Sequence, residues 1–127
     1  MSRNGGRVTI LVAENDPGIS DLLRAIMQRE GWQTLAASDG EQAVAMALKN
    51  DADLMILDYA LPQLSTIEVC RRVSAMLSMP VIMIGERDYA RDKILSIRAG
   101  AKSYVGKPFQ VSELLAEIKA ALGISLR

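Results

Sequence analysis

Acidic and amide side chains follow two separate apolar segments of the chain, and a lysine follows a third. Glu14, Asn15 and Asp16 come directly after the first apolar run, Asp58 closes the third, and Lys107 comes soon after the last. Carboxylate and amide oxygens are ligands for a hard cation such as Mg²⁺, and a carboxylate can also attack as a nucleophile. The chemistry open to this set is therefore cation binding and carboxylate attack beside a positive charge.

Whether these side chains meet depends on the elements that carry them. Apolar runs typical of strands occur at 8–13, 32–36, 53–57, 80–84 and 103–105. Helical patterns lie between and after them, at 17–30, 42–48, 67–76, 88–98 and 111–122. Apolar strands that alternate with helices predict a parallel sheet covered on both faces. The expected fold class is α/β: a doubly wound five-stranded parallel sheet of order 2-1-3-4-5, flavodoxin-like, with two helices on one face and three on the other.

That strand order brings the polar side chains together. The first and third strands are neighbours, so Glu14, Asn15 and Asp58 are expected in the crevice at the carboxyl ends of the strands. The fifth strand lies two positions from the third, about 10 Å away at ~4.8 Å per strand, and a lysine side chain spans most of that gap. Lys107 is therefore expected beside the acids. Asp16 precedes a proline and is predicted to cap the next helix rather than to bind a cation.

Composition excludes several other classes of function. The 127 residues allow about one domain at ~150 residues per domain. Fifteen basic and fifteen acidic residues give zero net charge, which disfavours nucleic-acid binding by bulk charge. The absence of histidine excludes catalysis by histidine and imidazole metal ligands. The single cysteine, Cys70, cannot form an internal disulfide, and no apolar run is long enough to cross a membrane, so a cytoplasmic location is expected.

The domain limits follow the same pattern. Residues 1–7 are polar and glycine-bearing and are predicted to form a flexible leader. Residues 8–122 are expected to form the domain, and 123–127 a C-terminal tail or the start of a linker.

Three segments of the chain resemble the receiver domain of two-component response regulators, over roughly residues 7–122. They are Ile10–Pro17, Asp53–Pro62 and Gly100–Phe109. Each is weak evidence alone, but in this order and on the predicted strand ends they are highly specific. The resemblance implies a signalling module and not an enzyme. It would take a phosphoryl group from a histidine kinase or phosphotransfer protein and act on an output domain or a downstream protein, without direct contact with nucleic acid or membrane.

The resemblance also implies a role for individual residues. Asp58 matches the phosphoacceptor and Lys107 the lysine that contacts the phosphoryl group, with a cis bond to the following proline. Tyr104 matches the switch aromatic, and Gly85 stands where receivers have the switch hydroxyl. The implied Mg²⁺ ligands are Glu14, Asn15, Asp58 and the backbone carbonyl of Ala60.

Three positions depart from the family pattern. Asn15 replaces an aspartate, so Mg²⁺ is expected to bind weakly. Gly85 lacks the hydroxyl that would draw the switch loop towards the phosphoryl group, which is expected to uncouple Tyr104. Ser65-Thr66 replaces the usual Asp-Gly, and a β-branched residue at 66 would be strained if the loop required a positive φ there.

These departures leave an alternative function open. The same fold could serve as a pseudo-receiver, a protein interaction module that works without phosphorylation. Two enzymes or carriers of related fold fit less well: an aspartyl-phosphate phosphatase needs a second aspartate where Ala60 stands, and a flavin carrier needs a phosphate-binding loop after the first strand. A homodimer through the fourth helix, fifth strand and fifth helix is expected to be weak, because Lys102-Ser103 replaces the usual acidic pair.

Overall fold

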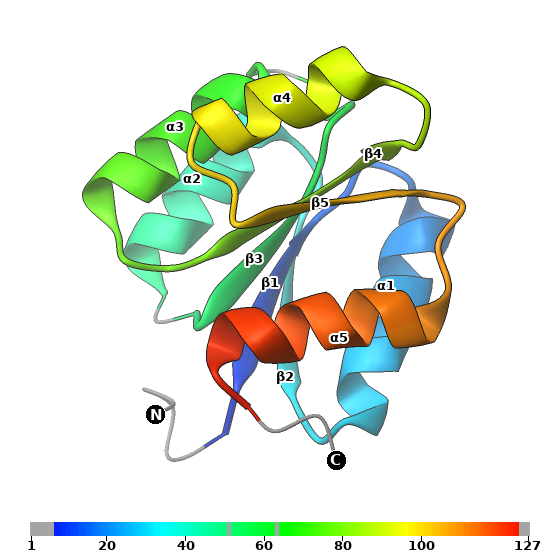
Figure 1. Cartoon of the computed structure of the whole chain (residues 1–127). Helices are drawn as coiled ribbons and strands as arrows, with labels where there is room; N and C mark the ends of the chain where they lie inside the picture. The colour runs from blue at the N-terminus through cyan, green and yellow to red at the C-terminus, as the bar shows by residue number, and fades with distance from the viewer. Residues whose placement is uncertain (1–6, 51, 63, 125–127) are drawn as a thin grey trace.

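A computed structural model describes residues 7–50, 52–62 and 64–124, in which strands and helices alternate (Figure 1). The strands are β1 (Thr9–Ala13), β2 (Gln33–Ala37), β3 (Leu54–Asp58), β4 (Val81–Glu86) and β5 (Ser103–Lys107). The helices are α1 (Pro17–Arg29), α2 (Gly40–Lys49), α3 (Thr66–Met76), α4 (Ala90–Arg98) and α5 (Val111–Leu122). Most of the predicted leader (1–6) and the end of the predicted tail (125–127) lie outside the described residues.

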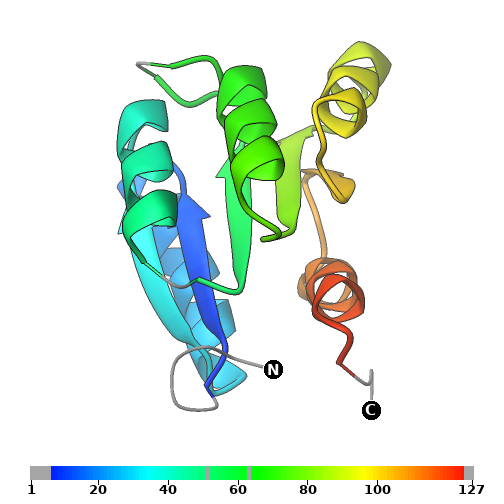
Figure 2. The same ribbon diagram turned by 90° about the vertical axis from the view of Figure 1, so that its left-hand side faces the viewer.

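The strands form one parallel sheet in the order β2-β1-β3-β4-β5, which confirms the predicted topology. Figures 1 and 2 show α1 and α5 on one side of the sheet and α2, α3 and α4 on the other. The predicted end of the last strand at 105 was wrong. β5 continues to Lys107 because Gly106 and Lys107 pair with Gly85 and Glu86 of β4. This extension carries the lysine directly to the edge of the sheet where β3 ends.

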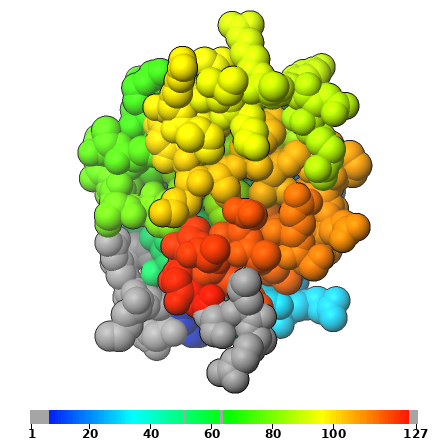
Figure 3. Space-filling view, in the orientation of Figure 1, coloured from blue at the N-terminus to red at the C-terminus, as the bar shows by residue number. Residues whose placement is uncertain are grey.

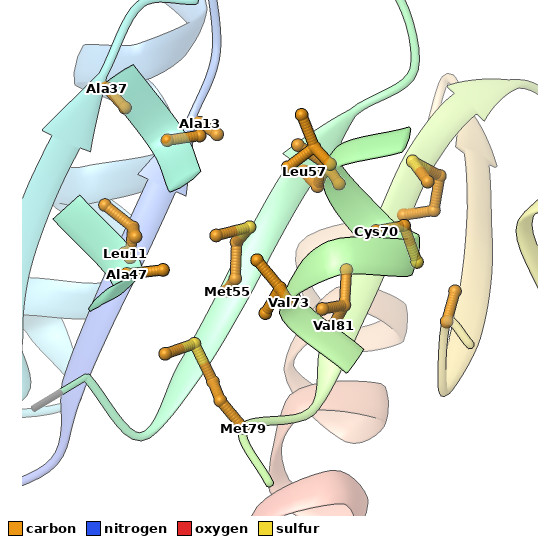
Figure 4. Packing of buried hydrophobic residues seen from close by; sticks show 14 of the residues in the cluster. Leu11, Ala13, Ala37, Ala47, Met55, Leu57, Cys70, Val73, Met79 and Val81 are labelled. Atoms are coloured by element: carbon orange, nitrogen blue, oxygen red, sulfur yellow. The ribbon is translucent and has the colours of Figure 1, made fainter. Parts of the chain in front are cut away.

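The central strands β1, β3 and β4 are buried on both faces, so successive side chains supply two separate apolar layers. Leu11 and Met55 face α2 and α3, where they pack with Cys70 and Val73 (Figure 4). The alternate residues of the same strands pack against α1 and α5; those from β1 and β3 are Ile10, Val12, Leu54 and Ile56. This double core fixes the register of the central strands, and therefore the place where each strand ends.

The helix α4 is attached differently from the other helices. Its one buried residue is Ser96, whose Oγ donates a hydrogen bond of 2.7 Å to the carbonyl of Asp92. Ile94 and Ile97 are 51% and 44% exposed. Figure 3 shows α4 and α5 on the same face of the molecule, with part of β5 between them. No helix within residues 7–50, 52–62 and 64–124 combines the length and apolar content that a membrane span requires.

Candidate functional site

Asp58 is the last residue of β3, and its side chain is 7% exposed. Its Oδ1 accepts a hydrogen bond of 2.9 Å from the backbone N–H of Ala60, and its Oδ2 lies 3.2 Å from Nζ of Lys107. The Asp58 carboxylate is therefore held in one orientation by a backbone donor on one oxygen and a cation on the other.

Lys107 ends β5 and reaches across β4 to Asp58, as the strand order predicts. The peptide bond between Lys107 and Pro108 is cis, which confirms the expectation from the family resemblance. The lysine side chain is 26% exposed, so its contact with Asp58 is partly shielded from water. Partial burial strengthens the attraction between the two charges relative to a pair at the surface.

Glu14 is buried beside Asp58 at the end of β1, as the first-and-third-strand arrangement predicts. Burial, together with a hydrogen bond shared with Asp58, raises the pKa of Glu14 to about 7. Burial also acts to raise the pKa of Asp58. The hydrogen bonds from Glu14 and from the Ala60 N–H, with the charge of Lys107, outweigh it and hold that pKa below its ordinary value. Asp58 is thus the more acidic member of the pair, with its pKa below and that of Glu14 above the ordinary value.

The residues next to Glu14 divide as the sequence predicts. Asp16 caps α1: its Oδ1 accepts hydrogen bonds from the backbone N–H groups of Gly18 and Ile19 at 2.8 and 3.1 Å. Asp16 is therefore occupied and does not replace the missing acid at Asn15. Asn15 is exposed, at the edge of a hollow of about 300 Å³ beside the site.

The donor set matches a magnesium site with few charges. Among the described residues, no three or more acids, cysteines or histidines are grouped closely enough to hold a metal by themselves. A Mg²⁺ ion here would depend on two carboxylates, Glu14 and Asp58, completed by the Asn15 amide, the Ala60 carbonyl and water. Mg²⁺ commonly binds with one or two carboxylates and several waters, so these residues fit the ion.

Gly85 and Tyr104 are in direct contact, which the sequence does not indicate. A Cβ atom placed on Gly85 would clash with the phenol oxygen of Tyr104 and lie 2.9 Å from its Cζ. The tyrosine hydroxyl donates a hydrogen bond of 2.8 Å to the carbonyl of Glu86. The ring therefore occupies the space that a threonine or serine side chain would take at position 85.

Thr66 joins the site although sequence reasoning treated it only as a source of strain. It is the first residue of α3, in a helical backbone, so the strain that a positive φ would cause does not arise. Its Oγ1 donates to the backbone carbonyl of Asp58 at 3.0 Å and accepts from the N–H of Leu61 at 3.4 Å. This hydroxyl closes the loop after β3 onto the backbone of Asp58. Nothing in the local pattern Ser65-Thr66 indicates such a long-range bond.

Known proteins have related sequences and the same fold. Residues 10–119 match the response regulator receiver domain family. The sensory transduction protein RegX3 of Mycolicibacterium smegmatis is 36% identical over 114 residues, which cover 90% of this chain and 50% of that protein. RegX3 of Mycobacterium tuberculosis strain H37Rv matches with the same identity and coverage. The chain therefore spans about half the length of these relatives.

Solved structures agree with these relatives. A putative response regulator from Chloroflexus aurantiacus superposes with a TM-score of 0.88 at 28% identity, over 92% of this chain and 98% of that one. The receiver domain of the sensor histidine kinase PA1611 from Pseudomonas aeruginosa, which holds a magnesium ion in its active site cleft, gives 0.84 at 26% identity, over 93% and 99%. The shared sequence, strand order and fold show that the chain belongs to the response regulator receiver domain family.

Proposed function

We propose that this receiver domain accepts a phosphoryl group on Asp58 from a histidine kinase or a histidine phosphotransfer protein. The observation that supports this most strongly is the ionised Asp58 carboxylate held against Lys107, with Oδ2 3.2 Å from Nζ. The 127 residues contain no histidine, so the phosphohistidine donor lies outside them. In this role the domain is a signalling module rather than an enzyme with turnover.

In the proposed transfer, Asp58 is the nucleophile, and the groups around it compensate charge and hold its orientation. A carboxylate oxygen of Asp58 attacks the phosphorus atom, the P–N bond of the donor phosphohistidine breaks, and the imidazole leaves and takes up a proton. Lys107 compensates the negative charge on the phosphoryl oxygens, as a preformed cation in a partly dry site does effectively. The Ala60 N–H keeps the carboxylate oriented during the attack.

We propose that Mg²⁺ binds to Glu14, Asn15, Asp58 and the carbonyl of Ala60. When bound, the ion would supply further positive charge to the phosphoryl oxygens. An amide at position 15 removes one negative charge from this set, so the binding is proposed to be weak. The magnesium-bearing PA1611 receiver domain supports the assignment of this cleft.

The response to phosphorylation is proposed to be small, because Gly85 carries no hydroxyl and Tyr104 already occupies the adjacent space. Residues 8–122 would form the receiver unit, and 123–127 a tail or the start of a linker. The receiver unit would act on an output domain or on a downstream protein. We place the domain in the cytoplasm, without direct contact with nucleic acid. A homodimer through α4, β5 and α5 would be weak, because Lys102 and Ser103 provide no acidic pair.

Phosphorylation by acetyl phosphate in the presence of Mg²⁺ tests the proposal, with intact-mass spectrometry as the readout. Wild-type protein is expected to gain one phosphoryl group, and Asp58→Asn to gain none. Asp21→Asn is the matched control, since Asp21 is an exposed acid at the hollow beside the site. If neither acetyl phosphate nor a kinase labels the wild type, the pseudo-receiver function replaces this one. Equal labelling of Asp58→Asn would place the phosphoryl group on another residue and overturn the assignment of Asp58.

A further inference from the structure

One arginine connects the loop after β4 to the segment that carries Lys107. The Arg87 guanidinium donates through Nη2 to the carbonyl of Gly106 at 3.0 Å, and it also donates to the carbonyl of Pro108. These two carbonyls stand on either side of Lys107. The same nitrogen lies 3.6 Å from Oε1 of Glu113, in the first turn of α5. Sequence reasoning did not single out Arg87, because nothing in its local pattern shows which distant carbonyls it reaches.

The backbone in this region is shaped for that contact. Gly106 pairs with Gly85, and a Cβ atom on Gly106 would lie 2.7 Å from Cα of Arg87. The loop after β4 therefore crosses directly over Gly106, a close approach that a larger residue would prevent. Tyr104 of β5 donates a hydrogen bond to the carbonyl of Glu86, the last residue of β4. This bond holds the residue that precedes Arg87. The arginine thus leaves a fixed backbone and reaches a fixed pair of acceptors.

The position of the Lys107 ammonium depends on the backbone that Arg87 holds. The four-carbon side chain of Lys107 has a limited reach, so the position of its Cα determines whether the ammonium can lie against Asp58, its partner among the described residues. The Arg87 Nη2 carries two hydrogens held in the guanidinium plane, so this one nitrogen can donate to both carbonyls in a fixed geometry. Accepting these bonds fixes the Gly106–Lys107 and Pro108–Phe109 peptide groups, which flank the Lys107–Pro108 bond.

We propose that Arg87 is a positioning residue for Lys107: it holds the carbonyls of Gly106 and Pro108 so that the lysine reaches Asp58. This inference rests on the proposed phosphorylation of Asp58 for its functional meaning. Its structural part, the placement of the Lys107 ammonium, can be measured separately.

The test compares Arg87→Ala with Arg87→Lys, in the full 127-residue chain, using acetyl phosphate and Mg²⁺. Arg87→Ala is expected to lower the rate constant of phosphorylation about ten-fold, because a small misplacement of a charge-compensating group has effects of that size or larger. Arg87→Lys is expected to restore part of the rate, since an ammonium can bind one of the two carbonyls. The matched control is Arg72→Ala, which removes an exposed arginine paired with Glu68 on α3 and is expected to leave the rate unchanged.

A double-mutant comparison separates a positioning role from a general structural one. In a Lys107→Met background, Arg87→Ala is expected to change the rate less than about two-fold, because its effect passes through the lysine that is already gone. An equally large effect with and without Lys107 would overturn the proposal. Circular dichroism checks that each variant is folded, and if Arg87→Ala is not, Arg87→Gln takes its place.

NMR of the Lys107 ammonium distinguishes failure of this inference from failure of the proposed function. In Arg87→Ala the Lys107 Nζ signal is expected to move towards that of a solvent-exposed lysine, whereas in Arg72→Ala it stays at the wild-type position. If the wild type is never phosphorylated, the function fails while this readout still decides the role of Arg87. An unchanged Lys107 signal in Arg87→Ala would overturn the inference.

Discussion

Two neighbouring corners of the sheet edge carry different kinds of side chain. The acceptor corner, made of Glu14, Asp58 and Lys107, combines a buried carboxyl pair with a lysine 3.2 Å from Asp58. The loop corner, made of Gly85, Tyr104 and Arg87, has no hydroxyl at position 85, and an aromatic ring fills that space. The acceptor corner has the groups that phosphoryl transfer needs. In the loop corner, the Tyr104 ring occupies the space next to Gly85.

Under the proposed function, receiving a phosphoryl group and responding to it would depend on separate sets of side chains. Charge compensation depends on Lys107 lying near Asp58, and that contact is present although position 85 carries no hydroxyl. A response through that hydroxyl would need an atom that Gly85 does not possess. The bonds from Arg87 to the carbonyls beside Lys107 are a direct physical link between the corners that does not require this hydroxyl.

The largest effect is expected at the acceptor corner. Lys107→Met removes the cation from Asp58 and is expected to lower the rate constants for both formation and hydrolysis of the aspartyl phosphate by about 10²-fold, the size typical of losing one electrostatic stabiliser. Quench-flow or mass-spectrometric time courses measure both rates. Lys102→Met, an exposed lysine just before β5, serves as control. Equal rates in wild type and Lys107→Met would remove the basis for separating the two corners.

A change at the loop corner is expected to alter stability and the tyrosine position instead. Gly85→Thr forces Tyr104 out of its place, and such overpacking lowers the free energy of unfolding by about 1–3 kcal/mol. Denaturant titration measures the loss, and the NMR signals of the Tyr104 ring report its displacement. In a Tyr104→Ala background the penalty of Gly85→Thr is expected to disappear. A threonine tolerated without any movement of Tyr104 would contradict the observed packing.

A charge added to the acceptor corner is expected to act on the metal alone. Asn15→Asp restores a third carboxylate and is expected to lower the dissociation constant of Mg²⁺ about ten-fold, since water screens most of the attraction at this exposed position. Isothermal titration calorimetry measures the affinity. Gln42→Glu adds the same charge at the hollow beside the site without replacing a proposed ligand, so a much smaller effect is expected. Equal tightening by both variants would mean that Asn15 is not a ligand position.

The smallest effect is the pH behaviour of the loop corner. Burial, with the nearby charges of Asp92 and Glu86, raises the pKa of Tyr104 to about 12. The unfolded chain loses this proton near pH 10 while the folded chain keeps it, so the stability that Tyr104 contributes is full below pH 10 and is lost between about 10 and 12. The difference in absorbance between wild type and Tyr104→Phe follows this titration. Ionisation near pH 10 in protein that is still folded would show that the ring is not held against Gly85.

Much of the acceptor corner could be predicted because its residues stand at the ends of strands. Periodicity gave the strands, the strand order placed Glu14 and Asp58 side by side, and the proline after Asp16 marked that residue as a helix cap. The roles of Tyr104 and Arg87 could not be predicted in this way. They depend on how closely β5 approaches Gly85, and the loop after β4 approaches Gly106, which no local pattern encodes. The contacts of Thr66 could not be predicted for a related reason: the loop does not require a positive φ at this residue, because α3 begins there.

The attachment of α4 has a consequence for the dynamics of the domain. A helix that buries one serine and leaves Ile94 and Ile97 exposed loses little apolar contact when it lifts from the sheet. The free energy of such a local opening is small compared with that of global unfolding, so its amide hydrogens should exchange faster than those of α1, which buries Leu23, Ile26 and Met27.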